Sequence, residues 1–332
     1  MIVFKSKFFK RFVPIVAVGG LAYWYSKKSA VLSKSYSDFP ISRNIQFSNK
    51  SNFDITLFQY QTCPFCCKVR TYLDFRGINY KIVEVNSITR EQIKWSDYRK
   101  VPIAVIQQGD KPIQINDSSV IISLLESCRV NTKINLEHLN EYYPSLESVD
   151  KGKKKIEYLN KYNIMYGQLP PSEEAMQLEK KWREWVDTKF VHTLSPNIYR
   201  TPSEALEAFH YFSEIGQWEK YFNTFERQCI IYVGAFVMFW LGKVLKKRHN
   251  LTDDVRMSLF NEAKVWTKAL NNKNFIGGNS PNLGDLAMYG VLISIEGCSA
   301  FNELIGKNKS LALWFHRTRE TLKQPEEKAV AV

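Results

Sequence analysis

The stretch Ile55-Thr56-Leu57-Phe58-Gln59-Tyr60-Gln61-Thr62-Cys63-Pro64-Phe65-Cys66-Cys67 decides the fold of this chain. Its first six residues are rich in β-branched and aromatic side chains, which is typical of a strand. Residues 68–76 repeat apolar side chains at helical spacing, and Gly77 suits the position after a helix end. Pro64 suits the first helical turn, because its missing N–H would have no partner there. The stretch predicts a strand, a turn that carries thiols, and a helix.

Cys63 lies at or just before the predicted helix start, where unpaired N–H groups and the helix dipole favour a thiolate. The pKa of its thiol is expected to be lowered, which raises the reactive fraction near neutral pH. Cys66, one turn later and less exposed, is placed to resolve a mixed disulfide. Cys67 points elsewhere and is predicted to be structural. Two ordinary buried cysteines are the alternative, but the order of strand, CPFC and helix favours a thiol site.

The segments after this helix continue the pattern. Strands are predicted at 80–85, 102–106 and 112–115, with a short helix or turn at 89–95, a hairpin turn at Gly109-Asp110 and a helix at 118–127. Asp117 and Ser118 are candidates to cap that last helix. The order βαβαββα predicts an α/β domain over residues 51–128, in which helices flank a mixed sheet.

The second half of the chain is predicted to be helical from about residue 151. The run 229–241 reads CIIYVGAFVMFWL, and thirteen residues are short for a membrane span, so a buried central helix is predicted. Asn282 and Asp285 are expected to form a capping box with a structural role. An apolar stripe at helical spacing is more typical of a core than of a cofactor site, and it comprises Trp182, Trp185, Val186 and Phe190.

The basic character of the chain belongs mostly to its N-terminal leader. The net charge is +13, and residues 1–37 supply +7 of it with no Asp or Glu, which leaves +6 for the other 295 residues. Two short basic clusters, at 151–155 and 246–249, lie where loops or helix ends are expected. They favour a solvated surface, so nucleic acid is not an expected partner.

Residues 12–25 read FVPIVAVGGLAYWY, an uncharged run of 14 residues between basic pairs. A spanning helix needs about 17–20 apolar residues, although flanking lysines and interfacial aromatic residues help a shorter one. A signal anchor is favoured, followed by an organelle-targeting leader and then by a cleaved secretory peptide. Residues 1–50 are therefore assigned to a leader outside the fold.

Six cysteines occur, three of them clustered at residues 63, 66 and 67 and three scattered. They are too few and too unevenly placed for a disulfide framework, which favours a reducing compartment for the folded part. One CxxC without a second CxxC or a spaced His pair does not complete a zinc site, so no metal is predicted.

The first domain resembles the glutaredoxin and glutathione-transferase branch of the thioredoxin superfamily. The resemblance implies a cis proline, which matches Pro102 and would turn the backbone of Val101 toward glutathione. It also implies a γ-glutamyl pocket at Asp117 and Ser118, where Ser118 and backbone N–H groups hold the ligand carboxylate and Asp117 meets its amine. Plain helix capping is the alternative for these two residues. The implied second domain is all-helical and glutathione-transferase-like, over residues 171–325.

Four motifs together resemble the membrane-associated prostaglandin E synthase type 2 family, over about 55–322, with a helical insert at 129–170. The motifs lie at 60–66, 98–103, 116–121 and 194–202. The resemblance implies an isomerase that uses Cys63 and Cys66 to convert prostaglandin H2, a lipid endoperoxide, to prostaglandin E2. It also implies that Tyr60 hydrogen-bonds the sulfur and that Phe65 lines an apolar pocket. A tyrosine that packs against the sheet is the alternative for Tyr60.

The same resemblance implies glutathione as a cofactor, haem bound through the glutathione thiolate, and a homodimer. It further implies an N-terminal membrane anchor at the Golgi or endoplasmic membrane with a cytosolic catalytic domain, and the leader leaves mitochondria as an alternative. Two other functions stay open. One is a glutaredoxin-like thiol–disulfide oxidoreductase, and the other is a protein that binds glutathione, haem or a lipid without catalysis.

Overall fold

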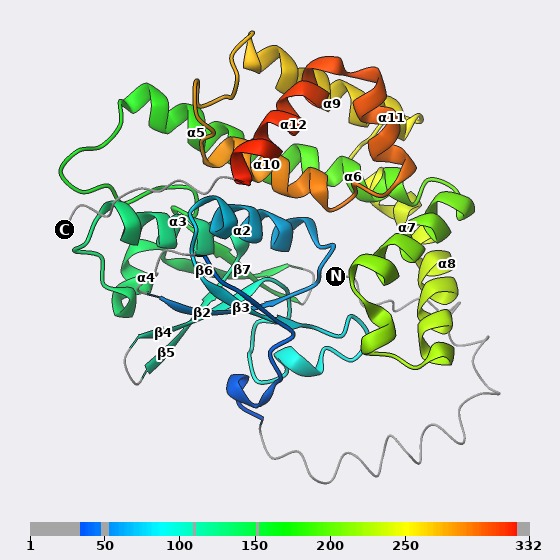
Figure 1. The fold of residues 1–332 in the computed structure, drawn as a ribbon, viewed down its shortest axis with the longest axis horizontal. Coiled ribbons are helices and arrows are strands. Elements are labelled where there is room, and N and C mark those ends of the chain that lie inside the picture. The colour runs from blue at the N-terminus through cyan, green and yellow to red at the C-terminus, as the bar shows by residue number, and fades with distance from the viewer. Residues whose placement is uncertain (1–33, 48–52, 109–110, 151–152, 324–332) are drawn as a thin grey trace.

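The computed structural model describes residues 34–47, 53–108, 111–150 and 153–323. The anchor predicted at 12–25 and the turn predicted at Gly109-Asp110 lie outside these residues. Figure 1 shows the sheet domain under a layer of helices, with α7 and α8 as a pair at one edge of the molecule.

The first domain is built on a five-stranded sheet of order β1-β3-β2-β4-β5. The strands are β1 (Arg43–Ile45), β2 (Asp54–Gln59), β3 (Tyr80–Glu84), β4 (Ile103–Gln108) and β5 (Lys111–Asn116). Strands β2 and β3 are parallel, with Leu57 opposite Ile82, and the other pairs are antiparallel. Helices α2 (Pro64–Phe75) and α3 (Ser118–Val130) pack on the sheet face that carries Leu57. The predicted α/β thioredoxin-like domain is confirmed.

The sheet contains one strand more than the sequence predicted. Strand β1 lies within residues 1–50, which we assigned to the leader, and the backbone N–H of Ser42 donates to Ile82 O at 2.7 Å. Phe39 is also buried, with its ring 6.5 Å from that of Phe58. A strand of three residues is too short to show an alternating pattern in the sequence. Strand β1 is defined instead by its pairing with β3 at the edge of the sheet. The folded domain therefore begins before residue 50.

The segment 129–170 differs from the predicted helical insert. After η4 (Leu136–His138) and the short α4 (Leu139–Tyr142), it contains an antiparallel hairpin of β6 (Ser145–Asp150) and β7 (Lys153–Tyr158). The prediction of continuous helix from residue 151 is therefore wrong, because regular helix begins again only at Glu173. Each strand has six residues, so the alternation is short, and the turn sequence Asp150-Lys151-Gly152 is the signal that could have identified it.

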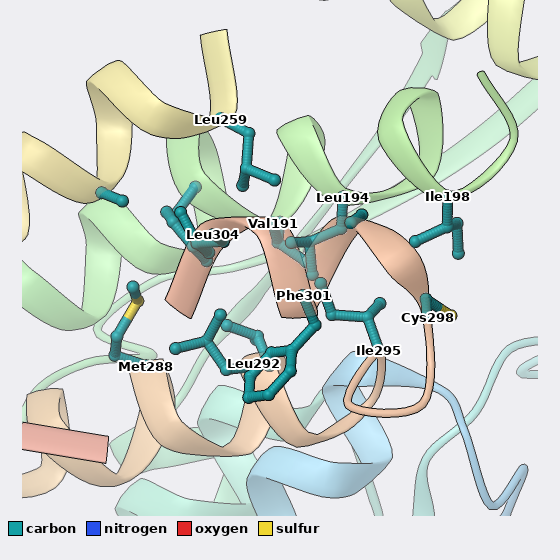
Figure 2. Packing of buried hydrophobic residues seen from close by; sticks show 14 of the residues in the cluster. Val191, Leu194, Ile198, Leu259, Met288, Leu292, Ile295, Cys298, Phe301 and Leu304 are labelled. Carbon is teal, nitrogen blue, oxygen red and sulfur yellow. The ribbon is translucent and has the colours of Figure 1, made fainter. Parts of the chain in front are cut away.

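The second domain is helical, as predicted, and Figure 2 shows its core, where side chains of α6, α9, α10 and α11 meet. Trp182, Val186 and Phe190 are buried in this core, which confirms the predicted apolar stripe. The elements are α5 (Glu173–Trp185), the π-helical turn η5 (Val186–Phe190), α6 (Val191–Ile198), α7 (Pro202–Ile215), η6 (Trp218–Lys220), α8 (Thr224–Arg248), α9 (Val255–Leu270), α10 (Leu283–Ile293), α11 (Ser299–Lys307) and α12 (Lys309–Leu322).

Helix α10 joins the two domains. A Cβ on Gly290 would lie 2.6 Å from Lys68 Cα, so glycine allows α10 to approach the backbone of α2. Asn282 caps α10 by accepting from the N–H groups of Gly284 and Asp285. The buried carboxylate of Asp285 in turn accepts from Trp314 Nε1 at 2.9 Å. The capping box thus has the structural role that the sequence predicted, and it holds the helix against which the thiol-bearing helix packs.

Helix α8 contradicts the prediction of a buried central helix. It has 25 residues, of which only Ile230, Ile231, Ala235 and Gly242 are buried. A capping box between Asn223 and Glu226 starts it before the apolar run, and a basic last turn extends it beyond. Within the described ranges it is one helix of sufficient length and apolarity to cross a membrane. The apolar composition of the run 229–241 suggested a buried helix, but only one side of α8 packs against the rest of the protein.

Candidate thiol site

Cys63 is the N-cap residue of α2, with extended backbone angles of φ −73° and ψ 123°, and it is half-buried. The Cys66 thiol beside its sulfur lowers the pKa of the Cys63 thiol most, and the nearby backbone N–H groups of Cys66 and Phe65 lower it further, although burial opposes them. The direction is the one expected for a thiol at a helix start, but the largest contribution comes from the second cysteine.

Cys66 is fully buried, and burial raises its pKa well above the ordinary thiol value. Its thiol therefore keeps its proton and can donate it to the neighbouring sulfur. The motif holds two thiols whose pKa values are shifted in opposite directions: Cys63 is partly accessible and its pKa is lowered, whereas Cys66 is buried and its pKa is raised.

Arg70 is a functional candidate that the sequence analysis missed. Its buried guanidinium donates to the carbonyl of Gln61 at 2.8 Å, to Cys67 Sγ at 3.1 Å and to the side-chain carbonyl of Gln59. The turn that precedes Cys63 is thereby fixed, and the charge of Arg70 helps to lower the pKa of Cys63. The signal was available, because a residue seven positions after Cys63 lies on the same helix face.

Cys67 is buried, its Sγ donates to Gln61 O at 3.3 Å, and burial raises its pKa. These contacts fit the structural role predicted for it.

Tyr60 ends the strand before the thiols, and its carbonyl accepts from the Cys63 N–H at 3.2 Å. Burial raises the pKa of its phenol, and a hydrogen bond and the charge of Arg90 oppose this rise. The two thiols add to the rise, so the phenol lies within their electrostatic range. Because Arg90 is the partner of the phenol here, the bond from Tyr60 to the sulfur stays a prediction.

A cavity of about 500 Å³ opens beside Cys63, a size typical of small-molecule sites. One end is polar and includes Gln61, Glu84, Asn86 and Gln92. The other end is apolar and comes from the helical domain. Its walls are Leu194, Ile198 and Tyr199 of α6, Phe209 and Phe212 of α7, Trp218, Phe222, and Met238 of α8. Sequence reasoning missed this wall, because its residues follow Cys63 by 130 positions or more and have the composition of an ordinary core.

Phe65 does not line this cavity, in contrast to the pocket role predicted for it. Its ring packs against the core of the helical domain, and Lys68 Nζ lies 5.7 Å from the ring centroid. Two positions after the N-cap, the side chain leaves the helix on a different side from the Cys63 sulfur. Phe65 therefore joins the two domains.

The residues predicted to bind glutathione lie in the loop before β4 and at the start of α3. The peptide bond between Val101 and Pro102 is cis. Asp117, at φ +70°, is the N-cap of α3, and its Oδ1 accepts from Ser119 N at 2.8 Å and Val120 N at 3.4 Å. Capping is therefore one role of Asp117. Ser118 is buried at the start of α3, and none of these four residues lines the cavity.

Tyr98 lies within electrostatic range of both the thiols and Asp117. Burial raises the pKa of its phenol, with further contributions from Asp117 and from the two thiols Cys63 and Cys66. The sequence analysis quoted Tyr98 within a motif but gave it no role.

A buried ion pair fixes the helix of the thiols against the helical domain. Lys68 Nζ lies 2.5 Å from Asp187 Oδ1, and the hydroxyl of Ser119 donates to Asp187 Oδ2 at 2.6 Å. Burial raises the pKa of Asp187, but the Lys68 charge and hydrogen bonds lower it overall. Asp187 lies in the π-helical turn η5, and Ser119 follows the predicted glutathione residues in α3. The pair thus links α2, α3 and the second domain.

Comparison with known proteins gives the following similarities. The chain is 41% identical over 309 residues to prostaglandin E synthase 2 of Mus musculus, covering 91% of this chain and 77% of that protein. It is 42% identical over 277 residues to prostaglandin E synthase 2 of Danio rerio, covering 81% and 71%. A glutaredoxin family model matches residues 55–110. Apo glutathione S-transferase III shares 13% identity at a TM-score of 0.43, covering 83% of this chain and 99% of that one.

Proposed function

This chain belongs to the prostaglandin E synthase 2 family, and on that premise we propose that it is an isomerase that converts prostaglandin H2 to prostaglandin E2. The single observation that supports a thiol mechanism most is the position of Cys63. Its pKa is lowered, and it borders a cavity of about 500 Å³ with one polar and one apolar end. A fatty acid derivative with a polar ring has the same division.

In the proposed reaction, the Cys63 thiolate attacks one oxygen of the endoperoxide, and a sulfur–oxygen bond forms as the oxygen–oxygen bond breaks. The other oxygen takes a proton and becomes a hydroxyl group. A base then removes the ring hydrogen on the carbon that bears the sulfur-linked oxygen. The electron pair of that C–H bond forms the ketone, and the sulfur–oxygen bond breaks to return the thiolate. Substrate and product are isomers, so no external oxidant or reductant is needed.

Product analysis with purified protein tests this function. Cys63→Ser is expected to lose about 100-fold or more of the conversion, because a hydroxyl is a far weaker nucleophile than a thiolate. Cys128→Ser is the matched control, because Cys128 is half-buried on α3, outside the cavity, and its pKa is raised to about 11. Full conversion by the Cys63 variant would reject the mechanism.

A second test addresses the role of Cys66. Cys66→Ala removes the largest contribution to the lowered pKa of Cys63, so alkylation of Cys63 should shift to higher pH. The rate of alkylation by iodoacetamide against pH, followed by mass spectrometry, measures this shift. An unchanged profile would show that the backbone N–H groups and Arg70 alone set the pKa.

We propose that glutathione binds at Val101, Pro102, Asp117 and Ser118. The start of α3 supplies the N–H group and the hydroxyl of Ser118 for a carboxylate, and Asp117 keeps an oxygen beyond the one that accepts from Ser119 and Val120. Ser118→Ala should weaken glutathione binding measured by calorimetry, whereas Ser145→Ala, in the β6 strand, should not. Equal affinities in the two variants would place the ligand elsewhere.

Haem is the other group that the family resemblance implies. The apolar, aromatic wall beside Cys63 suits a porphyrin, and Phe209, Phe212 and Trp218 would contact it. Bound haem supplies a redox-active iron. Because it would fill space that a lipid also needs, we expect haem binding and isomerisation to exclude each other. Absorbance titration in the presence of a lipid competitor tests this expectation.

A glutaredoxin-like oxidoreductase is the second candidate function, since the Cys66 thiol lies in hydrogen-bond contact with the Cys63 sulfur. Cys66→Ser separates the two candidates. An oxidoreductase that forms the internal disulfide loses turnover in this variant, whereas the isomerase keeps its nucleophile. A non-catalytic binding protein would show ligand binding and no activity change in any cysteine variant.

We also infer a homodimer that residues 1–33 attach to a Golgi or endoplasmic membrane, with the thiol domain in the cytosol. The acid-free basic leader supports a membrane-associated N-terminus, and mitochondria are the alternative destination. Fractionation of cells that express the chain with and without residues 1–33 distinguishes the two compartments. Recovery of the intact chain in the soluble fraction would reject the anchor.

A further inference from the structure

Glu84 is the one carboxylate among the described residues that line the cavity beside Cys63. It is the last residue of β3, and its side chain is 14% exposed. The other lining groups that titrate are the Cys63 thiol and the phenols of Tyr60, Tyr199 and Tyr221. A reaction that needs a base in this cavity therefore has few groups to draw on.

The proposed isomerisation requires a base after the sulfur–oxygen bond has formed, because the ring hydrogen must leave before the ketone can appear. Cys63 cannot be that base, since its sulfur is bonded to the substrate at this step. The phenols do not suit the role, because a phenol keeps its proton near neutral pH and burial raises the pKa of Tyr60 and of Tyr199 further. A carboxylate is ionised there and can accept a proton.

Residues of β2 and of the turn after it hold the Glu84 carboxylate beside the thiols. Its Oε1 accepts from the backbone N–H of Gln61 at 2.6 Å, and its Oε2 accepts from Gln59 Nε2 at 3.1 Å. The carbonyl of Gln61 accepts from Arg70 at 2.8 Å, so the residue two positions before Cys63 is held from both sides. The carboxylate is thereby fixed to the turn that carries the nucleophile.

These contacts leave the carboxylate able to accept a proton. Each carboxylate oxygen has two lone pairs, and the two bonds above use one on each. Arg43 Nη2 lies 3.5 Å from Oε2 of Glu84, and it also donates to the side-chain carbonyl of Gln61. Burial raises the pKa of Glu84, although its hydrogen bonds and the neighbouring arginines oppose this rise. A raised pKa makes the carboxylate a stronger base.

We propose that Glu84 is the catalytic base that removes the ring hydrogen. The inference deepens the proposed isomerase function and rests on it. The carboxylate takes a proton from the carbon that bears the sulfur-linked oxygen, and the electron pair of that C–H bond forms the C=O bond. The sulfur–oxygen bond then breaks and returns the Cys63 thiolate. Glu84 releases its proton to water, which balances the proton that the other oxygen took.

A purely structural role is the alternative, since Glu84 connects its own strand to β1 through Arg43 and to β2 through Gln59. If that were its only role, loss of the charge would move the turn and change the reactivity of Cys63. A base acts after the thiolate has attacked. Its loss therefore leaves the thiolate unchanged and stops the reaction at the covalent adduct, so the two roles differ in the step that they affect.

Glu84→Gln in the full chain tests the base, because it keeps the size of the side chain and an acceptor for Gln61 but cannot take up a proton. We expect kcat for prostaglandin H2 to fall about 100-fold or more, while iodoacetamide alkylates Cys63 at the wild-type rate. An adduct of Cys63 with the mass of the substrate should accumulate in intact-protein mass spectra. Glu84→Asp, which keeps a carboxylate, should recover part of the rate. Glu214→Gln, exposed on α7 and outside the cavity, is the control.

A substrate deuterated at the ring carbon that loses its hydrogen gives a second readout. The kinetic isotope effect should be larger in Glu84→Asp than in the wild type, because proton removal becomes slower relative to the other steps.

The outcomes separate this proposal from the function on which it rests. Full conversion by Glu84→Gln would reject the base. Equal losses of conversion and alkylation would assign Glu84 to the turn instead, and loss of conversion without an adduct would place it at an earlier step, so either result would also overturn the proposal. Absence of conversion by the wild type would reject the isomerase itself, and the role of Glu84 with it.

Discussion

Helices α10 and α8 both contain a long apolar run, and they occupy opposite positions in the protein. Ten of the eleven residues of α10 are buried, whereas four of the 25 residues of α8 are. Helix α10 has neighbours on all sides, with α2 below it and the helical core above. Helix α8 contacts the protein along one side only. The comparison shows that hydropathy indicates how much free energy a helix gains when its side chains are buried. Whether they are buried depends on how many other elements pack against that helix.

The two helices also have different roles at the site. Helix α10 fixes the helix that carries the thiols, through Gly290 and the buried pair of Lys68 and Asp187 beside it. Helix α8 supplies part of the cavity wall through Met238, and its outer face is exposed.

The largest expected effect comes from one substitution placed in both helices. Val291 of α10 is fully buried and Val233 of α8 is 61% exposed. Val291→Asp should lower the free energy of unfolding by about 4 kcal/mol or more, because it buries an unpaired carboxyl group. Val233→Asp should change it by about 0.5 kcal/mol or less in dilute, monomeric protein. Urea unfolding of the two variants measures the difference, and similar losses would break the comparison.

The buried ion pair next to α10 should give the second largest effect. Asp187→Ala leaves the Lys68 ammonium buried without a partner, which is expected to cost about 3–5 kcal/mol. Asp54→Ala is the control, because its pair with Lys81 is solvent-exposed and should contribute about 0–1 kcal/mol. Thermal unfolding of both variants provides the test. A small loss for Asp187→Ala would mean that water reaches Lys68.

Two glycines probe how tightly α10 is packed. Gly290→Ala places a Cβ 2.6 Å from Lys68 Cα, so overpacking should cost about 1–3 kcal/mol. Gly306→Ala in α11 meets nothing within 4 Å and should be neutral or stabilise by up to about 1 kcal/mol. Calorimetric melting of the two proteins should therefore shift in opposite directions. Equal shifts would show that α10 can move away from α2.

The smallest effect concerns pH and the attachment of α8. The rings of His192, in α6, and His249, after the end of α8, stack at 4.0 Å. Burial lowers the pKa of both, and each is further lowered by a neighbouring imidazole or guanidinium, while Asp187 opposes the shift at His192. Because the folded pKa values lie below the unfolded value of about 6.5, their contribution is present above about pH 6.5 and is lost as pH falls through the folded values.

His192→Gln should flatten this part of the pH profile. Urea unfolding at about pH 7.5 and about pH 5.5 measures it, and the wild-type loss on acidification should exceed that of the variant. Val265→Gln, also on the helical domain but away from the imidazoles, should keep the wild-type slope. If the stability of His192→Gln depended on pH as strongly as that of the wild type, groups other than these imidazoles would cause the loss of stability at low pH.

Much of the first domain could be predicted because its signals are local. The CPFC turn, Pro64 in the first helical turn and Asp117 before α3 each act within a few residues, and the structure has β2, α2 and α3 where the sequence placed them. The elements that the sequence did not predict are strands that depend on pairing with another strand. Strand β1 and the β6–β7 hairpin are short strands whose identity comes from a neighbour, so their own composition was not decisive.

The site shows the same limit. The order of strand, turn and helix pointed to Cys63 and Cys66, because a helix start acts on the thiol that caps it. The family resemblance placed Phe65 in the pocket, whereas in the structure Phe65 packs between the two domains. The aromatic wall from α7 and α8 was missed, since no spacing in the sequence relates it to the thiols. Arg70 was overlooked although its position seven residues after Cys63 places it on the same helix face.

The sequence by itself determined the strand, turn and helix that carry the thiols, the helical second half and the basic, apolar leader, because each depends on chemistry between near neighbours in the chain. Only the tertiary structure decided which apolar helix is enclosed and which residues line the cavity. Burial and cavity shape depend on segments far apart in the chain that meet after folding, and composition does not record which of them meet.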